Sequence, residues 1–350
     1  MTPAEIDGYL DDCRVLALEE LERIVPAHGR YAPVLYGLML DYPRRVSKGL
    51  RPALCIATCR ALGGALEPVL SSAAVLELYH NAFLIHDDVE DGSELRRDRP
   101  TLHRTHGVPV AVNVGDAMLA LALEPLLDNM AAVGLGKALR IMRVVARMAR
   151  ESAEGQALEL DWMRRGRWDL TDVDYVRMVY KKTSWYTFIA PVLIGAIVTG
   201  ASPAALAELR RFAALLGIAF QIQDDVLNLV GEQARYGKEI AGDLWEGKRT
   251  LALSHALRST QTGDREQMCA VLLKPRPYDE GDPGVHKTSD EVRWLAGLID
   301  RSGGVDYAQR VAGRYARRAA RALQRATWIE PSIHRDFLAA LVDFVVDRDR

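Results

Sequence analysis

The chain has 350 residues, enough for one large domain or two ordinary ones, and 49% are hydrophobic and 26% charged, as in globular proteins. Its 45 basic and 47 acidic residues leave a net charge of −2, so no global field favours nucleic acid as a partner. Basic residues with a role in function are therefore expected in local clusters.

Four cysteines, Cys13, Cys55, Cys59 and Cys269, are too few for a disulfide framework, and Cys55-x3-Cys59 has no partner pair with zinc-site spacing. They indicate reduced thiols in a cytoplasmic protein. No basic segment followed by an apolar one opens the chain, and the most apolar stretch, residues 188–201, is short and interrupted by Gly and Pro. We therefore expect neither a signal peptide nor a membrane span.

Helical patterns dominate the chain and alternating β-branched segments are scarce, so we expect an all-α fold. Thr2-x-x-Glu5 predicts a capping box at the start of the first helix. Later helices are predicted to be separated by Gly and Pro near residues 26–29, 63–64, 107–109, 134–136 and 200–203. These breaks predict ten or more helices, which we expect to form a single domain, residues 1–350, built as one bundle around a central apolar cavity. Residues 274–290, rich in Pro, Gly and acids, predict a surface loop.

Two acidic clusters, residues 87–91 and 224–228, each end an apolar helical run. At 3.6 residues per turn, Asp87 lies one turn from Asp91, and Asp224 lies one turn from Asn228. If the two clusters face each other, their carboxylates repel, so they need cations between them. Oxygen ligands without His or Cys are typical of Mg²⁺, which carboxylates usually share with substrate phosphates. We expect a magnesium site, although acids on a helix are more often a solvated face.

Basic residues accompany the acidic clusters. Any one of them alone is typical of an ordinary surface charge. Together they indicate ionisation of a diphosphate ester, in which metals and basic groups stabilise the charge on the leaving group. They are Lys48, Arg51, Arg96, Arg97, Lys182 next to Thr183, Lys238 and Lys248.

At these residues the chain resembles the trans-isoprenyl diphosphate synthase family, most clearly from Lys48 to about Thr250. Asp87-Asp88-x-x-Asp91-x4-Arg96-Arg97 is similar to the family's first aspartate-rich motif. Phe220-Gln221-Ile222-Gln223-Asp224-Asp225 is similar to the second, and Gly237-Lys238-x4-Asp243-x4-Lys248-x-Thr250 is similar to the signature that follows it.

The resemblance implies roles for the motif residues. Asp87, Asp91 and Asp224 would be the principal Mg²⁺ ligands, supported by Asp88 and Asp225. The allylic diphosphate would be bound by Arg96, Lys182, Thr183, Gln221, Lys238 and Lys248. The diphosphate of isopentenyl diphosphate would be bound by Lys48, Arg51, His80 and Arg97.

The reaction implied by the resemblance has three steps. Metal-assisted loss of diphosphate gives an allylic cation, the isopentenyl double bond attacks it head to tail, and a proton leaves, with the departing diphosphate as a plausible base. An apolar pocket between helices would exclude the water that quenches such a cation. The family is an α-helical bundle that commonly dimerises, so the resemblance also implies a homodimer.

Three residues depart from the family pattern. Asn228 replaces the last aspartate of the second motif and removes one negative charge. Asp98 stands where a glycine usually follows the tandem arginines. Gly49 stands where a second basic residue usually follows Lys48, so weaker binding of isopentenyl diphosphate is the expected effect.

Residues that precede Asp87 predict the product length. Phe83 lies one turn before Asp87 and Tyr79 a further turn back, and a turn rises about 5.4 Å, close to one prenyl unit. Aromatic side chains there argue against long products, whereas Ala82 removes bulk that the family's farnesyl synthases often have. Geranylgeranyl diphosphate is therefore the first prediction and farnesyl diphosphate the second. Packing of both rings in the core is the equally weighted alternative.

Two other functions stay open. A class I terpene cyclase also uses an aspartate-rich motif, but in this chain no Asn or Asp has Ser or Thr three residues on and Glu seven on, which is the usual second metal motif. In a non-catalytic subunit of a heteromeric synthase we would expect several metal ligands to be replaced, and here only one is, by Asn228.

Overall fold

The protein is all α apart from one short hairpin in the computed structural model, which describes residues 1–26, 28–231, 240–277 and 285–346. The elements labelled η are π-helices. In chain order the elements are α1 Pro3–Ile24, η1 Ala32–Tyr36, α2 Gly37–Met39, α3 Asp41–Arg44, α4 Leu50–Ala61, α5 Glu67–Glu90, β1 Leu95–Arg96, β2 Arg99–Pro100, α6 Leu102–His106, α7 Val108–Leu121, α8 Leu123–Val133, α9 Leu135–Arg164, α10 Asp172–Val179, η2 Tyr180–Ile189, α11 Ala190–Thr199, α12 Pro203–Val230, α14 Gly242–Glu246, α15 Leu251–Ser259, α16 Thr262–Leu273, α17 Ser289–Arg301, α18 Gly304–Arg325 and α19 Ile333–Val346.

Tertiary contacts divide the chain into two compact units. Unit 1 comprises Met1–Arg150, Trp185–Ala214 and Ala319–Phe344. Unit 2 comprises Glu151–Ser184, Leu215–Arg318 and Val345–Arg350. The all-α prediction is confirmed, while the expectation of a single domain stays a prediction.

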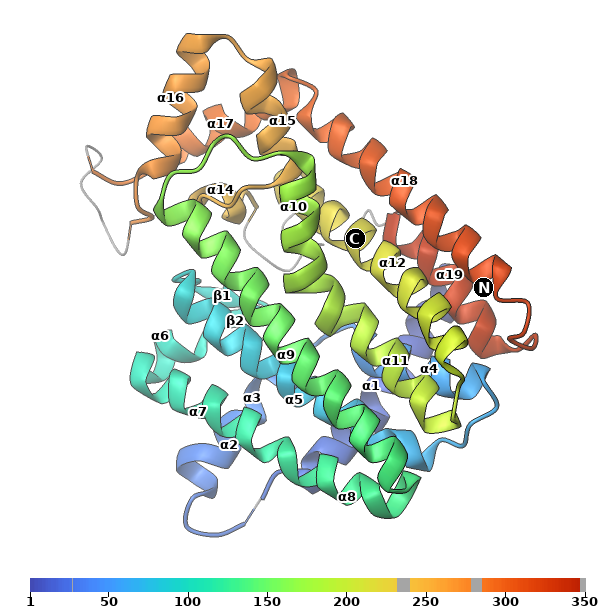
Figure 1. Ribbon diagram of the computed structural model, residues 1–350. Coiled ribbons are helices and arrows are strands. Elements are labelled where there is room, and N and C mark those ends of the chain that lie inside the picture. The colour runs from blue at the N-terminus through green and yellow to red at the C-terminus, as the bar shows by residue number, and fades with distance from the viewer. Residues whose placement is uncertain (27, 232–239, 278–284, 347–350) are drawn as a thin grey trace. The chain divides into compact units, whose positions relative to one another are not determined.

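Helix α5 is the core helix of unit 1 and packs against α1, α4, α7 and α8 (Figure 1). The most apolar stretch of the sequence forms α11, in which every residue from Ala190 to Val198 is buried. A Cβ at Gly195 would lie 2.2 Å from the Cys55 carbonyl oxygen, so glycine lets α11 approach α4 closely. The apolar run is thus a core helix.

The core of unit 2 is built from one face each of α10, the second half of α12, α15 and α17. Tyr175, Ile222, Leu253, Leu295 and Ile299 are all buried in this cluster. Because Ile222 lies two residues before Asp224, this packing fixes the segment from which Asp224 and Asp225 project.

Helix ends follow the predicted local signals. Thr2 and Glu5 form the predicted capping box of α1. The Gly and Pro clusters near residues 63–64, 107–109, 134–136 and 200–203 lie at helix boundaries, as predicted, and the last three extend into the first residues of α7, α9 and α12. Helix interiors disfavour Gly and Pro, which explains why these boundaries could be located from sequence.

Residues 274–277 and 285–288, within the predicted loop 274–290, are in neither helix nor strand. Of the rest of the predicted loop, residues 278–284 lie outside the described residues, and Ser289 and Asp290 begin α17. The predicted surface position is wrong for Lys287, which is 4% exposed. Its Nζ donates to the Trp245 carbonyl oxygen at 2.7 Å, and its N–H donates to the Pro275 carbonyl oxygen at 3.0 Å. This end of the connection is therefore anchored in unit 2.

In the described part of the chain, three helical segments have the length and apolar composition to cross a membrane: Glu67–Glu90, Val108–Val133 and Pro203–Val230. The prediction of no membrane span is therefore not confirmed. In the first and third segments 67% of the apolar window is buried inside the protein, against 39% in Val108–Val133, so less than half of the latter's window is buried. The four cysteines are free thiols, as predicted.

Candidate active site

The first acidic cluster lies at the carboxyl end of α5. Asp91 caps the helix, and its N–H donates to the Asp87 carbonyl oxygen at 2.8 Å. The two side chains therefore start one turn apart, as predicted, at the end where the helix dipole is negative. Carboxylates are destabilised there unless cations offset them, so this arrangement favours a cation-binding function over stability.

Asp88, between them, has a different environment and is fully buried. It accepts a hydrogen bond from the Tyr42 hydroxyl at 2.7 Å and a further pair from Arg96, whose Nε lies at 3.0 Å. Burial works to lower the pKa of Arg96, but Asp88 raises it above its ordinary value. Arg96 Nη2 is also 3.8 Å from Asp87. Asp88 thus positions Arg96 beside Asp87, and metal binding by Asp88 itself stays a prediction.

Tyr186 of η2 joins two of the residues predicted to bind isopentenyl diphosphate, and the sequence patterns did not indicate it. The Arg51 guanidinium lies 4.5 Å from the centre of the Tyr186 ring. The His80 ring stacks on the same Tyr186 ring, with the two ring centres 6.0 Å apart. Arg51 also donates to the Thr187 hydroxyl at 2.8 Å. The aromatic residues that follow Lys182-Thr183 were the available signal.

Arg97 belongs to the same region of unit 1. Its Nη1 donates to the Tyr42 carbonyl oxygen at 2.8 Å, and burial lowers its pKa to about 10. Burial also raises the pKa of the Glu77 carboxyl, whereas the nearby Arg51 and Arg97 lower it. Arg51 and Arg97 therefore share one half-buried carboxyl neighbour, Glu77.

Lys48 lies two residues before the start of α4, with its Nζ 5.4 Å from the centre of the Phe344 ring. The missing basic residue after it has a structural reason. Gly49 has φ +59°, and a Cβ there would lie 2.6 Å from the Arg14 Cβ. An arginine at position 49 would therefore be strained in this backbone.

The residues predicted to set product length form an aromatic cluster in unit 1. Ring centres of Tyr79 and Phe83 are 5.9 Å apart, and those of Phe83 and Tyr186 are 5.7 Å apart, both edge to face. Ala82 is fully buried. Tyr186 thus contacts both the predicted length residues and the predicted diphosphate-binding residues.

The second acidic cluster projects from α12 in unit 2. Asp225 accepts hydrogen bonds from the Tyr175 hydroxyl at 2.6 Å and from Gln221 Nε2 at 2.7 Å. Gln221 Oε1 in turn accepts from the Thr183 hydroxyl at 2.7 Å. Burial raises the pKa of Asp225 well above its ordinary value, and the carboxylates of Asp243 and Asp224 add to the effect. A neighbouring cation would relieve this repulsion.

Asn228, the departure in the second motif, holds the turn that carries Asp243. Its Oδ1 accepts from the Asp243 N–H at 3.0 Å, and its carbonyl oxygen accepts from the Ala241 N–H at 2.7 Å. A neutral amide makes this bond without adding a third charge beside Asp224 and Asp243. The departure therefore changes local charge but keeps a defined structural function.

Two of the lysines predicted to bind the allylic diphosphate lie against acids in unit 2. Lys182 Nζ is 2.5 Å from Glu159, and Lys248 Nζ is 2.5 Å from Glu246 and 4.0 Å from Asp243. A diphosphate would have to compete with these carboxylates. The third predicted lysine, Lys238, lies outside the described residues.

The donor set fits a divalent cation that is shared with substrate. In the described part of the chain, no group of three His, Cys, Asp or Glu side chains is arranged to hold a metal ion by itself. Mg²⁺ commonly keeps several waters and binds through one or two carboxylates plus phosphate oxygens. In unit 1 the Asp87 side chain is 24% exposed and Asp91 is half-buried, so both can bind such an ion, and in unit 2 Asp224 is half-buried as well.

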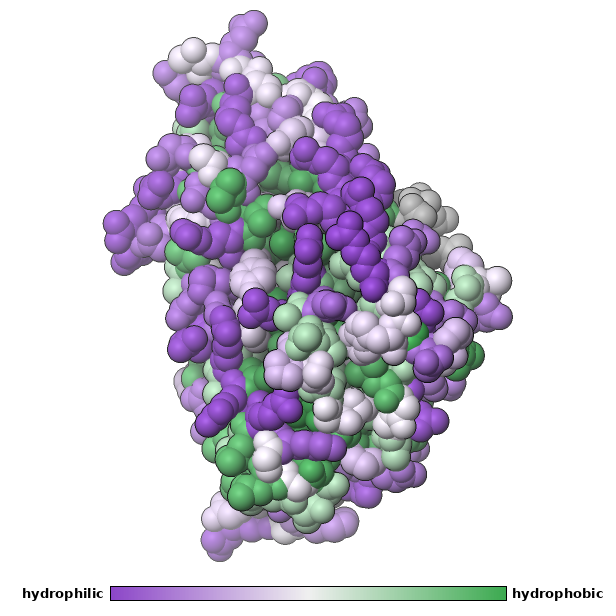
Figure 2. All heavy atoms as spheres, turned by 45° about the vertical axis from the view of Figure 1, so that its right-hand side comes forward, coloured by the Kyte–Doolittle hydropathy of each residue, from purple (hydrophilic) through white to green (hydrophobic). Residues whose placement is uncertain are grey.

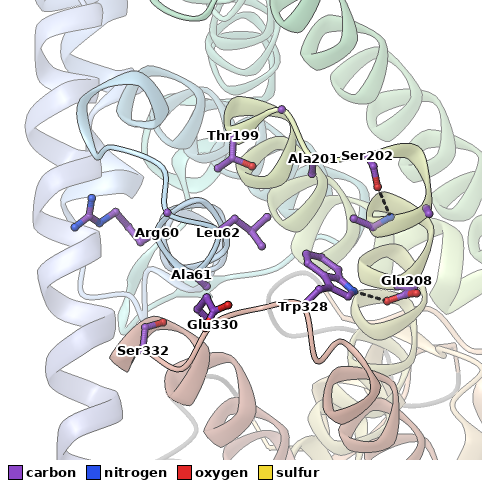
Figure 3. Close-up of a pocket in the computed structure, with 14 residues that line it drawn as sticks. Arg60, Ala61, Leu62, Thr199, Ala201, Ser202, Glu208, Trp328, Glu330 and Ser332 are labelled. Carbon is purple, nitrogen blue, oxygen red and sulfur yellow. Dashed lines mark hydrogen bonds between the residues drawn. The ribbon is translucent and has the colours of Figure 1, made fainter.

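A cavity of about 730 Å³ lies in unit 1 at the carboxyl end of α4 (Figure 3). Trp328 and Leu62 face it, and the Trp328 indole N–H donates to Glu208 at 2.8 Å. Arg51 begins α4 whereas Arg60 near its end lines the cavity, roughly 14 Å apart at 1.5 Å per residue. None of the unit 1 residues predicted to bind diphosphate lines this cavity.

Comparisons with known proteins agree with the family that the sequence motifs resemble. The family model described as polyprenyl synthetase matches residues 33–282, which include both acidic motifs. A short chain isoprenyl diphosphate synthase of Methanothermobacter thermautotrophicus is 34% identical over 302 residues, 86% of this chain and 86% of the relative.

Solved structures of known synthases have a similar fold. Geranylgeranyl pyrophosphate synthetase from Pyrococcus horikoshii superimposes with a TM-score of 0.85 at 28% identity, covering 99% of both chains. Geranylgeranyl pyrophosphate synthase from Corynebacterium glutamicum, solved with isoprenyl diphosphate and magnesium, gives 0.82 at 25% identity over 98% of this chain and 99% of that one. The chain thus belongs to the polyprenyl synthetase family and is a trans-prenyltransferase of the prenyl diphosphate synthase type.

Proposed function

We propose that the enzyme condenses isopentenyl diphosphate with an allylic diphosphate and stops at geranylgeranyl diphosphate. The observation that supports this product is the aromatic cluster of Tyr79, Phe83 and Tyr186, which begins one turn before Asp87 on α5. Each turn of α5 corresponds to about one prenyl unit, so the cluster limits the tail after a few condensations. The buried Ala82 leaves more room than a bulky side chain would, which favours the longer of the two short products.

The residues of each unit have separable tasks in this proposal. Mg²⁺, when bound, would neutralise the diphosphate and assist its departure, with Asp87, Asp91 and Asp224 as ligands. Arg51, His80 and Arg97 bind and orient the diphosphate of isopentenyl diphosphate. Arg96 stabilises negative charge next to Asp87, because Asp88 holds its guanidinium there.

Lys182 and Lys248 assist the same ionisation from unit 2. Each exchanges its carboxylate partner for a diphosphate oxygen, so binding energy is offset by loss of an existing ion pair. The buried aromatic and aliphatic side chains around Phe83 exclude water from the tail, which protects the allylic cation.

Substitution of Phe83 tests the proposed product. Phe83→Ala is expected to shift the main product by one or two isoprene units beyond geranylgeranyl diphosphate, because the ring nearest Asp87 is removed. Phe83→Tyr, which keeps the ring, is the matched control and should keep the wild-type product. Chromatography of dephosphorylated products measures the distribution, and an unchanged distribution in a folded Phe83→Ala enzyme would refute the length argument.

We further propose that the protein forms a homodimer in the cytoplasm, where the four free thiols stay reduced. Large apolar side chains on α8 and the first turns of α9 are exposed, namely Leu123, Leu127, Met130, Leu135 and Leu139. Such a face is typical of a subunit interface. Light scattering should give twice the 38.8 kDa chain mass, and Leu127→Glu should reduce it, whereas Val46→Glu at a 90% exposed isolated site should not. A monomeric wild type would contradict the proposal.

A further inference from the structure

Helix α18 has a stripe of arginines along its solvent face that the catalytic function does not use. The stripe consists of Arg310, Arg314, Arg317, Arg318, Arg321 and Arg325, all exposed. The first four belong to unit 2, and the same helix continues with the last two. The helix sequence contains one acidic residue, Asp306, near its start.

The spacing places these side chains on one narrow face. At 3.6 residues per turn the six positions fall within an arc of about 100°, and they span about 22 Å along the axis. The opposite face is buried through Val305, Ala308, Val311, Ala316 and Ala319. The stripe is therefore a linear array of guanidinium groups on a helix that packing holds in place.

Aromatic rings lie under two of these guanidinium groups. Arg310 is 6.0 Å from the centre of the Tyr307 ring, and Arg318 is 5.4 Å from the centre of the Tyr315 ring. Tyrosine and arginine together are typical of protein surfaces at the interface between headgroups and water. Figure 2 shows hydrophilic side chains gathered into a ridge on the face turned toward the viewer.

The local charge contrasts with that of the whole chain. The protein has a net charge of −2, so its total charge does not attract it to an anionic surface. A dense positive stripe on a negative protein instead gives an oriented attraction that acts within a Debye length of about 8 Å.

We propose that α18 docks the enzyme on an anionic phospholipid surface through this stripe. Charge complementarity with lipid phosphates supports this partner, because a row of guanidinium groups can bind several headgroups at once. The choice of lipid over nucleic acid rests on the proposed function: a prenyl diphosphate has a long apolar tail and an anionic head, so it partitions into a bilayer. Docking places its release next to that bilayer.

Vesicle binding tests the proposal. The full-length wild type is mixed with vesicles of equal parts phosphatidylglycerol and phosphatidylcholine, or of phosphatidylcholine alone, and bound protein is measured by flotation. The test variant combines Arg310→Gln, Arg314→Gln, Arg317→Gln and Arg318→Gln. The matched control combines Arg23→Gln, Arg44→Gln, Arg164→Gln and Arg165→Gln at other exposed arginines. Both variants carry a net charge of −2 − 4 = −6.

The wild type is expected to bind the anionic vesicles and not the neutral ones, and to be released by salt. Each basic side chain near an anionic surface contributes about fivefold, so the stripe variant, which loses four of them, should lose about six-hundredfold in binding. The control variant should keep wild-type binding. Prenyl transfer in lipid-free buffer should be equal in all three proteins, which separates loss of docking from loss of catalysis or fold.

Three results would overturn the proposal. They are equal binding of the wild type to neutral and anionic vesicles, equal loss of binding in both variants, and tighter binding of a labelled duplex DNA than of the anionic vesicles. Absence of synthase activity with retained vesicle binding would refute the proposed function and leave docking intact.

Discussion

Asp87, Asp88 and Asp91 lie within little more than one helical turn, yet their side chains have different surroundings. Asp88 is buried against Tyr42 and Arg96, whereas Asp87 is partly exposed at the negative end of α5. Burial of a charge is tolerated only with a partner, so Asp88 and Arg96 depend on each other. Asp87, 3.8 Å from Arg96, and Asp91 are only half-buried, so their oxygens are more accessible to a cation than those of Asp88.

Substitution of Asp88 and Asp91 should therefore give opposite results. Asp88→Ala leaves the Arg96 guanidinium buried without its carboxylate, so the free energy of unfolding should fall by about 3 kcal/mol or more. Asp91→Ala should change it by less than about 1 kcal/mol but lower turnover by about a hundredfold or more. Urea unfolding followed by circular dichroism, together with initial rates, measures both. Equal stability losses would contradict the assignment.

Tyr186 shows where residue patterns were insufficient. The motif residues were predictable because their partners are close in sequence, as with Asp87 and Asp91. The tyrosines that complete the sites come from distant segments: Tyr42 is 46 residues from Asp88, and Tyr175 is 50 residues from Asp225. A hydroxyl buried by tertiary packing leaves no local spacing signal, so these partners could not be predicted from the sequence alone.

At the scale of elements, the hairpin of β1 and β2 explains the second departure from the family pattern. Arg97 and Asp98, at its turn, have φ of +54° and +58°. Such a two-residue turn favours glycine, and aspartate tolerates the conformation better than most residues. Arg45 stabilises the hairpin, because its guanidinium donates to the carbonyl oxygens of Arg96 and Pro100 at 2.8 and 2.9 Å.

The free energy of unfolding should therefore depend on how well the residue at position 98 adopts a positive φ. Asp98→Gly should raise the free energy of unfolding by about 0.5 kcal/mol, the relief of strain being partly offset by the freer unfolded chain. Asp98→Ala should lower it by about 1 kcal/mol. Thermal unfolding of the three proteins measures the ranking, and a stabilising alanine would show that the turn conformation is wrong.

The connection between α16 and α17 was predicted in position but not in burial. Its composition indicated the irregular backbone of residues 274–277 and 285–288, whereas the buried contact of Lys287 with Trp245 depends on how α14 packs in unit 2. Burial and the neighbouring Arg249 lower the pKa of Lys287 to about 8.

This shift gives a pH dependence with a defined sign. Between about pH 8 and the ordinary lysine pKa of about 10.4, the unfolded chain holds a proton that the folded protein has released, so stability rises with pH. The stability of the wild type relative to Lys287→Met should therefore increase by about 1–2 kcal/mol from about pH 7 to about pH 9.5. Urea unfolding at both pH values measures it, and a difference that stays constant or falls would contradict the buried ammonium.

In the molecule as a whole, the two acidic motifs lie 137 residues apart (224 − 87), and both fall within the region that matches one enzyme family. Fold class and helix boundaries were predictable because apolar periodicity and Gly or Pro breaks act locally. The exposed apolar segment Val108–Val133 and the arginine stripe of α18 were present in the sequence, but whether such faces are covered is decided only by packing.

The most direct test is product chromatography after incubating the purified protein with Mg²⁺, isopentenyl diphosphate and, in turn, dimethylallyl, geranyl and farnesyl diphosphate. Wild-type protein is predicted to elongate each primer to geranylgeranyl diphosphate. Folded Asp87→Ala and Asp224→Ala proteins are predicted to lose turnover by about a hundredfold or more. Unconsumed or cyclised primers with the wild type, or near-normal turnover in either variant, would contradict the account.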